Sequence, residues 1–141
     1  MTLIEKLLDE EEGRRKQPYY DSLGYATVGV GHLIDPRKPC PLSDAVIDLL
    51  LHEDIARHRT DAEKLPAFAA LNEVRQCVMI SMVFQLGYVG VIAFKNMLKA
   101  IEAGDFEKAA KEGLDSTWAH QTPQRAKRQM AMLASGEWLP K

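Results

Sequence analysis

The chain has 141 residues, of which 46% are hydrophobic and 27% are charged, and its net charge is −2. This composition is that of a globular protein with one compact domain. The small negative charge excludes a global basic field that would recruit nucleic acid. No apolar run approaches the roughly 20 residues that cross a bilayer, so we expect neither a nucleic-acid partner nor membrane insertion. The two cysteines, Cys40 and Cys77, are too few for a disulfide framework.

The first predicted element is a helix that ends at Glu12. The apolar residues that recur at helical spacing are Leu3, Ile4, Leu7 and Leu8. Glu12 shares their face because it lies four residues after Leu8, and Gly13 follows as a typical helix stop. The negative end of the helix dipole and partial burial would both favour the protonated carboxyl that a general acid needs. Periodicity does not select Glu12 over Glu11, and the pattern also fits a group of solvated acids.

The segment after this helix has the composition of a small antiparallel sheet. Val28 and Val30 alternate with glycines, a period of two that is typical of a strand. Residues 22–24, Ser-Leu-Gly, have the composition of a tight hairpin connection. We therefore expect Asp21 at a turn and Thr27 on the strand that follows it.

A loop and a long helix come next. Three prolines between residues 35 and 41 predict a loop or a boundary between lobes. A helix is predicted from residue 43 to residue 64, with Ser43 as its N-cap. Its first half is apolar and its second half is charged, which suits a helix that packs at one end and bridges two lobes.

The rest of the chain reads as a helical core. Residues 72–86 are apolar on nearly all sides, as in a central helix, and Gly87 and Gly90 are expected to end it. Thr122 followed by Pro123 is a typical N-cap before the first helical residue. The shorter predicted helices are residues 93–103, 106–114 and 123–134.

The predicted fold is α+β and mostly α-helical, within one domain of residues 1–141. A small antiparallel β lobe covers residues 13–42, and the helix of residues 43–64 bridges to a larger helical lobe. That lobe combines residues 65–141 with residues 1–12, so the first helix returns to it.

Three blocks of sequence resemble the phage-type lysozymes, glycoside hydrolase family 24, and especially the lysozymes of T-even phages. The first block contains Glu12-Gly13, Tyr19, Asp21, Gly24-Tyr25 and the run Thr-Val-Gly-Val-Gly-His at residues 27–32. The others are Val-Phe-Gln-Leu-Gly at residues 83–87 and Trp-Ala-His-Gln-Thr-Pro-Gln-Arg-Ala-Lys-Arg at residues 118–128. The resemblance covers nearly the whole chain and implies a two-lobe lysozyme fold. It also implies cleavage of the β-1,4 bond between N-acetylmuramic acid and N-acetylglucosamine in peptidoglycan.

The resemblance assigns the catalytic roles. By matching position, Glu12 would be the general acid, which selects it over Glu11. Asp21 and Thr27 would position and activate the attacking water, and attack by water implies inversion at the anomeric carbon. The resemblance implies no cofactor and no metal.

The resemblance also implies residues outside the catalytic trio. Those that match sugar-contacting positions or the cleft floor are Leu33, Phe84, Gln85, Trp118 and Arg125, with Arg125 close to the general acid. Trp118 alone would more often be a packing residue than a sugar platform. A pair between His32 and Asp54 would join the β lobe to the bridging helix.

Two departures from the T-even lysozymes are visible. The segment between His32 and the bridging helix is shorter by about one helix, which affects the outer wall of the cleft. Met97 and Glu112 stand where those relatives carry a small hydroxyl and an amide that touch substrate.

Two functions follow from these residues. The first is an active muramidase, which we expect to be a monomeric endolysin released through a holin. It would stay in the host bacterial cytoplasm until release, because the N-terminal segment lacks the basic and apolar regions of a signal peptide. The second is a lysozyme-like protein that holds peptidoglycan without cutting it, and a secreted effector muramidase is a further alternative. The presence of Glu12, Asp21 and Thr27 together favours the enzyme.

Overall fold

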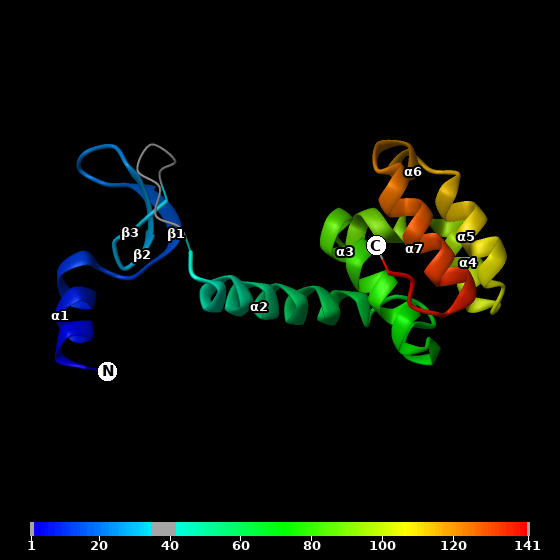
Figure 1. The fold of residues 1–141 in the computed structure, drawn as a ribbon, viewed down its shortest axis with the longest axis horizontal. Helices are drawn as coiled ribbons and strands as arrows, with labels where there is room; N and C mark the ends of the chain where they lie inside the picture. Colours follow the sequence, from blue (N-terminus) through cyan, green and yellow to red (C-terminus); the bar gives the residue numbers. More distant parts are fainter. Residues whose placement is uncertain (1, 35–41, 141) are drawn as a thin grey trace. The chain divides into compact units, whose positions relative to one another are not determined.

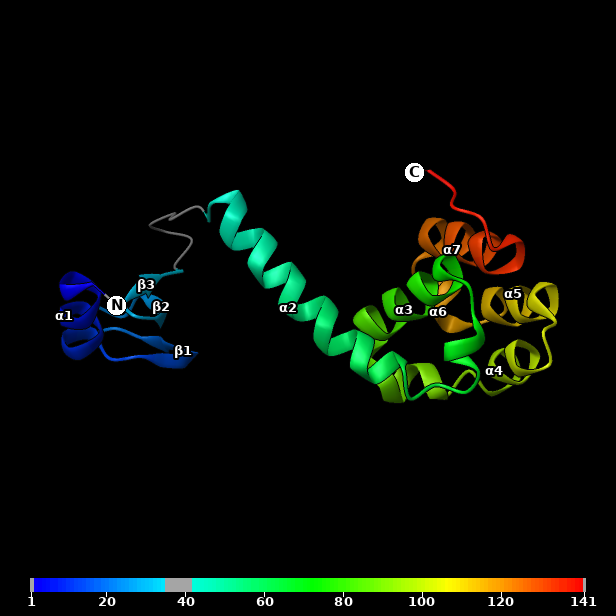
Figure 2. The same cartoon turned by 90° about the horizontal axis from the view of Figure 1, so that it is seen from below.

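The computed structural model describes residues 2–34 and 42–140. These residues form two compact units, Met1–Ile47 (the N-terminal unit) and Asp48–Lys141 (the helical unit). The described residues contain seven α-helices, one short 3-10 helix and one three-stranded antiparallel sheet (Figures 1 and 2). The predicted α+β, mostly helical fold of the lysozyme type is therefore confirmed.

In the N-terminal unit, helix α1 (Leu3–Glu12) begins and ends with defined caps. The Thr2 hydroxyl accepts a hydrogen bond from the Glu5 backbone N–H, and the Glu5 carboxylate accepts one from the Thr2 backbone N–H. The bond from the Thr2 N–H, together with a bond that the Thr2 hydroxyl donates to the same carboxylate, lowers the pKa of the Glu5 carboxyl. At the other end, the Gly13 N–H donates to the Asp9 carbonyl at 3.1 Å. The predicted helix end at Glu12 is therefore confirmed.

The sheet has the order β1-β2-β3, with β1 (Arg15–Tyr20), β2 (Ala26–Gly29) and β3 (His32–Leu33). Thr27 lies on the middle strand, opposite Tyr19 of β1 and Leu33 of β3. The register of β1 is irregular between Arg15 and Tyr19. Pro18 falls within this interval and has no N–H to donate to a ladder. The sheet thus places Thr27 between two neighbouring strands.

Helix α2 (Asp44–Ala62) forms close to the predicted bounds. The Ser43 carbonyl accepts hydrogen bonds from the N–H groups of Val46 and Ile47, each at 3.0 Å, so Ser43 precedes the helix as expected. The boundary between the two units falls inside α2, after Ile47. The bridging role of this helix and the return of the first helix to the helical lobe stay predictions. The predicted loop at residues 35–41 lies outside the described residues.

The helical unit is built around α3 (Glu73–Ile92) and α7 (Pro123–Ser135). Its other elements are the 3-10 helix Phe68–Ala70 and the helices α4 (Lys95–Glu102), α5 (Phe106–Leu114) and α6 (Thr117–Gln121). Helix α7 packs against α3, α5 and α6, and α4 packs against α5. The core is rich in methionine: Met79, Met82, Met97, Met130 and Met132 are each at most 3% exposed.

Helix α3 is the central helix of this unit. By length and composition, it is the one helix in the described part of the chain that could cross a bilayer. Its Val78, Met82 and Val83 side chains are at most 1% exposed, however, because other helices of the unit surround them. Gly87 interrupts the helix with φ of +74°, as expected. Gly90 does not end it, because the segment after Gly87 continues as helix through Ile92.

The hydroxyl of Thr122 does not cap α7. It donates instead to the Trp118 carbonyl at 3.0 Å, at the end of α6. The short helix α6 and the 3-10 helix were not expected, because neither is long enough to show a hydrophobic period.

Arg75 ties the start of α3 to the end of α7. Its Nε donates to the Leu133 carbonyl at 2.8 Å, and its Nη2 donates to the Ala134 carbonyl at 3.0 Å. These carbonyls belong to the last turn of α7, where no intrahelical donor is available, and a cation is favoured at that end. The guanidinium also lies 3.6 Å from the centroid of the Phe106 ring. One side chain therefore satisfies the end of α7 and packs on α5.

Replacing Arg75 by Met keeps apolar contact with the ring but removes the charge and both donors. We expect the free energy of unfolding to fall by about 2–3 kcal/mol, since hydrogen bonds from a charged group are worth roughly 1.5–3 kcal/mol. Urea denaturation measures this change. Arg59→Met is the control, because Arg59 is exposed and makes no ion pair or hydrogen bond within the described residues; it should change stability by less than about 0.5 kcal/mol. Equal losses in the two variants would contradict the role of Arg75.

Candidate functional site

Asp21 lies at the turn between β1 and β2. Its Oδ1 accepts hydrogen bonds from the backbone N–H groups of Leu23 at 2.9 Å and Tyr25 at 2.8 Å. Its backbone N–H donates to the Tyr25 carbonyl at 2.9 Å, and its carbonyl accepts from the Gly24 N–H at 3.0 Å. An aspartate that bonds the backbone two residues on is a typical turn former. Both side-chain bonds go to Oδ1, so the turn makes no use of Oδ2.

Thr27 follows on the middle strand and is 3% exposed. Its hydroxyl donates to the Tyr25 carbonyl at 2.9 Å. A threonine hydroxyl has one hydrogen and two lone pairs. Because the hydrogen is used for Tyr25, the oxygen can act toward any further partner only as an acceptor.

The backbone of Tyr25 connects these two side chains. Its N–H donates to Asp21 Oδ1, and its carbonyl accepts from both the Asp21 N–H and the Thr27 hydroxyl. The position of the Thr27 oxygen is therefore coupled to that of the Asp21 carboxylate through a single residue.

Glu12 is the last residue of α1, and its carboxyl group lies against the turn between β2 and β3. A Cβ atom built on Gly31 would lie 3.3 Å from Glu12 Oε2 and 3.4 Å from both Cδ and Cγ. The Glu12 side chain is exposed, so the N-terminal unit alone does not supply the partial burial that the helix face predicted. Glu12, Asp21 and Thr27 all belong to this unit.

His32 and Leu33 form β3. Leu33 is half-buried and lies opposite Thr27 on the sheet. The Nε2 atom of His32 is buried and has no hydrogen-bond partner within residues 2–34 and 42–140. Asp54 belongs to the other unit, where its carboxylate accepts a hydrogen bond from Arg57 on the same helix. The pairing of His32 with Asp54 stays a prediction.

Trp118 and Gln85 form a contact inside the helical unit. Trp118 is 4% exposed, and its indole N–H donates to Gln85 Oε1 at 2.9 Å. The Trp118 ring also meets the ring of Phe94 edge-on, with centroids 6.2 Å apart. Trp118 is therefore a packing residue, and its one polar side-chain group is hydrogen-bonded to Gln85.

Phe84 and Arg125 are more accessible. Phe84 is 43% exposed, and its ring lies 4.8 Å from the ring of His58, between centroids. Arg125 is exposed and its Nη2 donates to Ser81 Oγ at 2.9 Å, which joins α7 to α3. Both residues belong to the helical unit, so their proximity to Glu12 stays a prediction.

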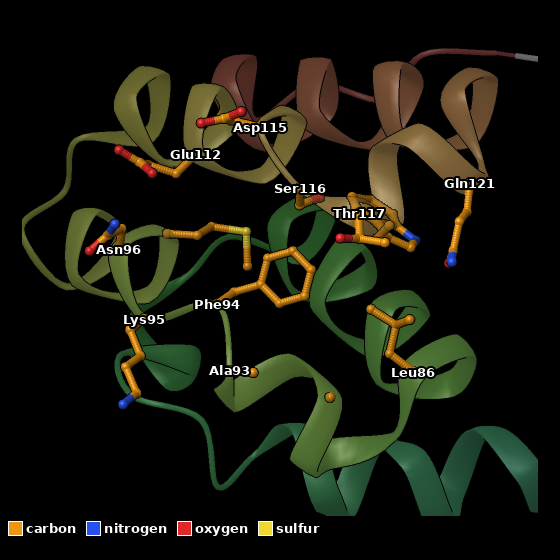
Figure 3. Close-up of a pocket in the computed structure, with 13 residues that line it drawn as sticks. Leu86, Ala93, Phe94, Lys95, Asn96, Glu112, Asp115, Ser116, Thr117 and Gln121 are labelled. Atoms are coloured by element: carbon orange, nitrogen blue, oxygen red, sulfur yellow. The ribbon is translucent and has the colours of Figure 1, made fainter.

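A pocket of about 430 Å³ opens in the helical unit between the end of α3, the start of α4 and helix α6 (Figure 3). Met97 lines it but is 1% exposed, so this residue fills the floor and offers no hydrogen bond. Glu112 and Asp115 lie together on the α5 side of the pocket (Figure 3). Lys95 lies on the α4 side. Sequence reasoning identified the changes at Met97 and Glu112 but missed Lys95 and Asp115, whose charges at helix ends were the available signal.

No metal site is apparent in the described part of the chain. No three His, Cys, Asp or Glu side chains among these residues come close enough together to hold an ion. The chemistry available at the candidate site is that of carboxyl groups, a hydroxyl and backbone groups.

Known proteins resemble most of this chain in sequence. The family model described as phage lysozyme matches residues 9–133. Probable T4-type lysozyme 1 of Dictyostelium discoideum is 30% identical over 160 residues, which cover 94% of each chain. Probable T4-type lysozyme 2 of the same organism is 27% identical, with the same coverage. The pre-baseplate central spike protein Gp5 of Enterobacteria phage T4 is 34% identical over 157 residues, which cover 93% of this chain and 27% of Gp5. This chain belongs to the phage lysozyme family.

Proposed function

We propose that this protein is a muramidase that hydrolyses the β-1,4 bond between N-acetylmuramic acid and N-acetylglucosamine in peptidoglycan. Membership of the phage lysozyme family supports a muramidase-type glycoside hydrolase. The observation that carries the specific mechanism is the coupling of Asp21 and Thr27 through the backbone of Tyr25.

Asp21 and Thr27 are suited to orient one water molecule. An ionised carboxylate can only accept hydrogen bonds, and the Thr27 oxygen has already donated its hydrogen to Tyr25. Two acceptors would take both hydrogens of a single water and leave a lone pair of its oxygen free for attack. As the new C–O bond forms, Asp21 would accept the proton of the water as a general base.

Glu12 would act on the leaving group. Cleavage of a glycosidic bond requires a proton on the leaving oxygen, and a carboxyl on the opposite face of the sugar from the water supplies it. With the water on one face and the acid on the other, the configuration at the anomeric carbon is inverted. Hydrolysis leaves Glu12 ionised and Asp21 protonated, and exchange of protons with solvent restores both.

The remaining predicted residues would bind the glycan. Phe84 presents an exposed ring on which a sugar can pack. Gln85 can use its side-chain N–H groups for substrate because its oxygen already accepts from Trp118. We infer that Trp118 acts through Gln85, since only 4% of its surface is exposed. Leu33 and Arg125 are proposed as further contacts.

The biological setting that we propose is lysis of a bacterial host. The protein would act as a monomeric endolysin, held in the cytoplasm until a holin releases it to the wall. The pocket that contains Met97 and Glu112 would change the more remote glycan contacts relative to T-even lysozymes and leave the catalytic trio unaffected.

Glu12→Gln removes the only proton that can reach the leaving oxygen and keeps the size of the side chain. We expect wall hydrolysis to fall by at least about 10²–10⁴-fold, with the melting temperature little changed because Glu12 is exposed. Turbidity loss of permeabilised Gram-negative cells measures the rate. Glu11→Gln is the matched control and should clear cells normally. Clearing by Glu12→Gln at the wild-type rate would exclude the assignment. Loss of hydrolysis with retained binding to purified peptidoglycan would separate chemistry from attachment.

The stereochemical outcome tests the water-activating pair. An inverting enzyme needs its two carboxyl groups roughly 6.5–9.5 Å apart, whereas a retaining enzyme holds them roughly 5–5.5 Å apart. We expect proton NMR of freshly cleaved soluble peptidoglycan fragments to show the α-anomer first at the new reducing end. Initial appearance of the β-anomer would mean that Asp21 forms a covalent intermediate and does not activate a water.

A further inference from the structure

We propose that Gly31 is a positioning residue for the general acid, because its missing side chain leaves the space that the Glu12 carboxyl group occupies. The inference rests on the proposed function of Glu12. Three atoms of that side chain lie within 3.4 Å of where a Gly31 Cβ would stand, and Oε2 is the nearest at 3.3 Å. Separations this short between a Cβ and non-bonded atoms are uncommon, so an added methyl group would displace the carboxyl group.

Gly29 provides an internal comparison two residues earlier. Both glycines have a left-handed backbone, with φ of +69° at Gly29 and +67° at Gly31, which disfavours residues with a Cβ. A Cβ on Gly29 would have no atom within 4 Å, however. The backbone alone accounts for Gly29, whereas Gly31 is additionally required by the approach of Glu12.

The space at Gly31 matters because the rest of the N-terminal unit does little to hold the Glu12 side chain. The Glu12 side chain is exposed at the end of α1, and its carboxyl group makes no hydrogen bond or ion pair within the described residues. An exposed glutamate side chain can adopt several rotamers, and the proposed mechanism requires one that places the carboxyl group at the leaving oxygen. The open space at Gly31 keeps the observed rotamer of Glu12 available, because Cγ, Cδ and Oε2 lie 3.3–3.4 Å from where a Cβ would stand.

Small displacements of a catalytic group lower the reaction rate strongly. Catalytic groups need to stay within about 0.5 Å of their productive position, and a shift of about 1 Å can lower the rate by around 10²-fold. Alanine at position 31 would move the carboxyl group by a few tenths of an ångström or turn it to another rotamer. The turnover number should therefore fall, while substrate binding by the rest of the chain stays.

The experiment compares Gly31→Ala with Gly29→Ala in the whole chain, using soluble peptidoglycan fragments. Both variants place a Cβ on a backbone of similar positive φ, and only the Cβ of Gly31→Ala meets Glu12. We expect kcat of Gly31→Ala to be about 10–100-fold below that of Gly29→Ala, with KM similar in the two. Equal kcat values for the two variants would overturn the proposal.

Asparagine variants keep the comparison valid if the alanine variants fail to fold. Asparagine tolerates a left-handed backbone better than alanine does, yet it has the same Cβ. Gly31→Asn should therefore stay impaired relative to Gly29→Asn, with melting temperatures that match. Recovery of kcat in Gly31→Asn would show that strain, and not contact with Glu12, caused the loss.

A double-mutant cycle isolates the action through Glu12. On a Glu12→Ala background, Gly31→Ala should leave the residual rate unchanged relative to Gly29→Ala, because no carboxyl group remains to be displaced. A further loss of similar size on that background would overturn the proposal.

The proposed function of Glu12 and the proposed role of Gly31 can fail separately. A fully active Glu12→Gln variant would remove the proposed function, whereas an inactive one combined with equal glycine variants would remove only the role of Gly31.

Discussion

The hydrogen bonds around the Tyr25 backbone are the constraint on which the candidate site depends. Asp21 uses its side chain and its N–H to close the turn onto Tyr25, and Thr27 adds its hydroxyl to the same carbonyl. Asp21 Oδ2 and the lone pairs of the Thr27 hydroxyl oxygen are not used by these bonds. The tight connection of two strands therefore leaves available the two oxygens that the proposed water-activating pair would use.

The helical unit meets a different requirement. Its core is filled by methionines and other apolar side chains, and Arg75 closes the end of α7. Two residues that we propose to touch glycan make hydrogen bonds inside this unit. Gln85 accepts a hydrogen bond from Trp118, and Arg125 donates one to Ser81. Side chains that would contact substrate are thus placed by residues that are buried or bonded inside the unit.

Glycine has two separate roles in the short segment between β2 and β3. At Gly29 only the backbone conformation excludes a side chain, whereas at Gly31 a neighbouring carboxyl group does so as well. The closeness of Glu12 to Gly31 brings the end of α1 against the turn between β2 and β3 within the N-terminal unit.

The sequence by itself determined the features that depend on nearby residues. Gly13 ends α1 after Glu12, and the Ser-Leu-Gly run places Asp21 at a turn, because each signal lies within a few residues of its effect. The alternating valines and glycines predicted a strand, but β2 ends at Gly29, and Val30 and Gly31 lie in the turn before β3. Only the tertiary structure decided the contacts between distant residues. The bond from Trp118 to Gln85 and the closeness of Gly31 to Glu12 depend on how separate elements pack. Local sequence patterns do not predict these contacts, because the contacts form only when helices and strands bury surface against one another.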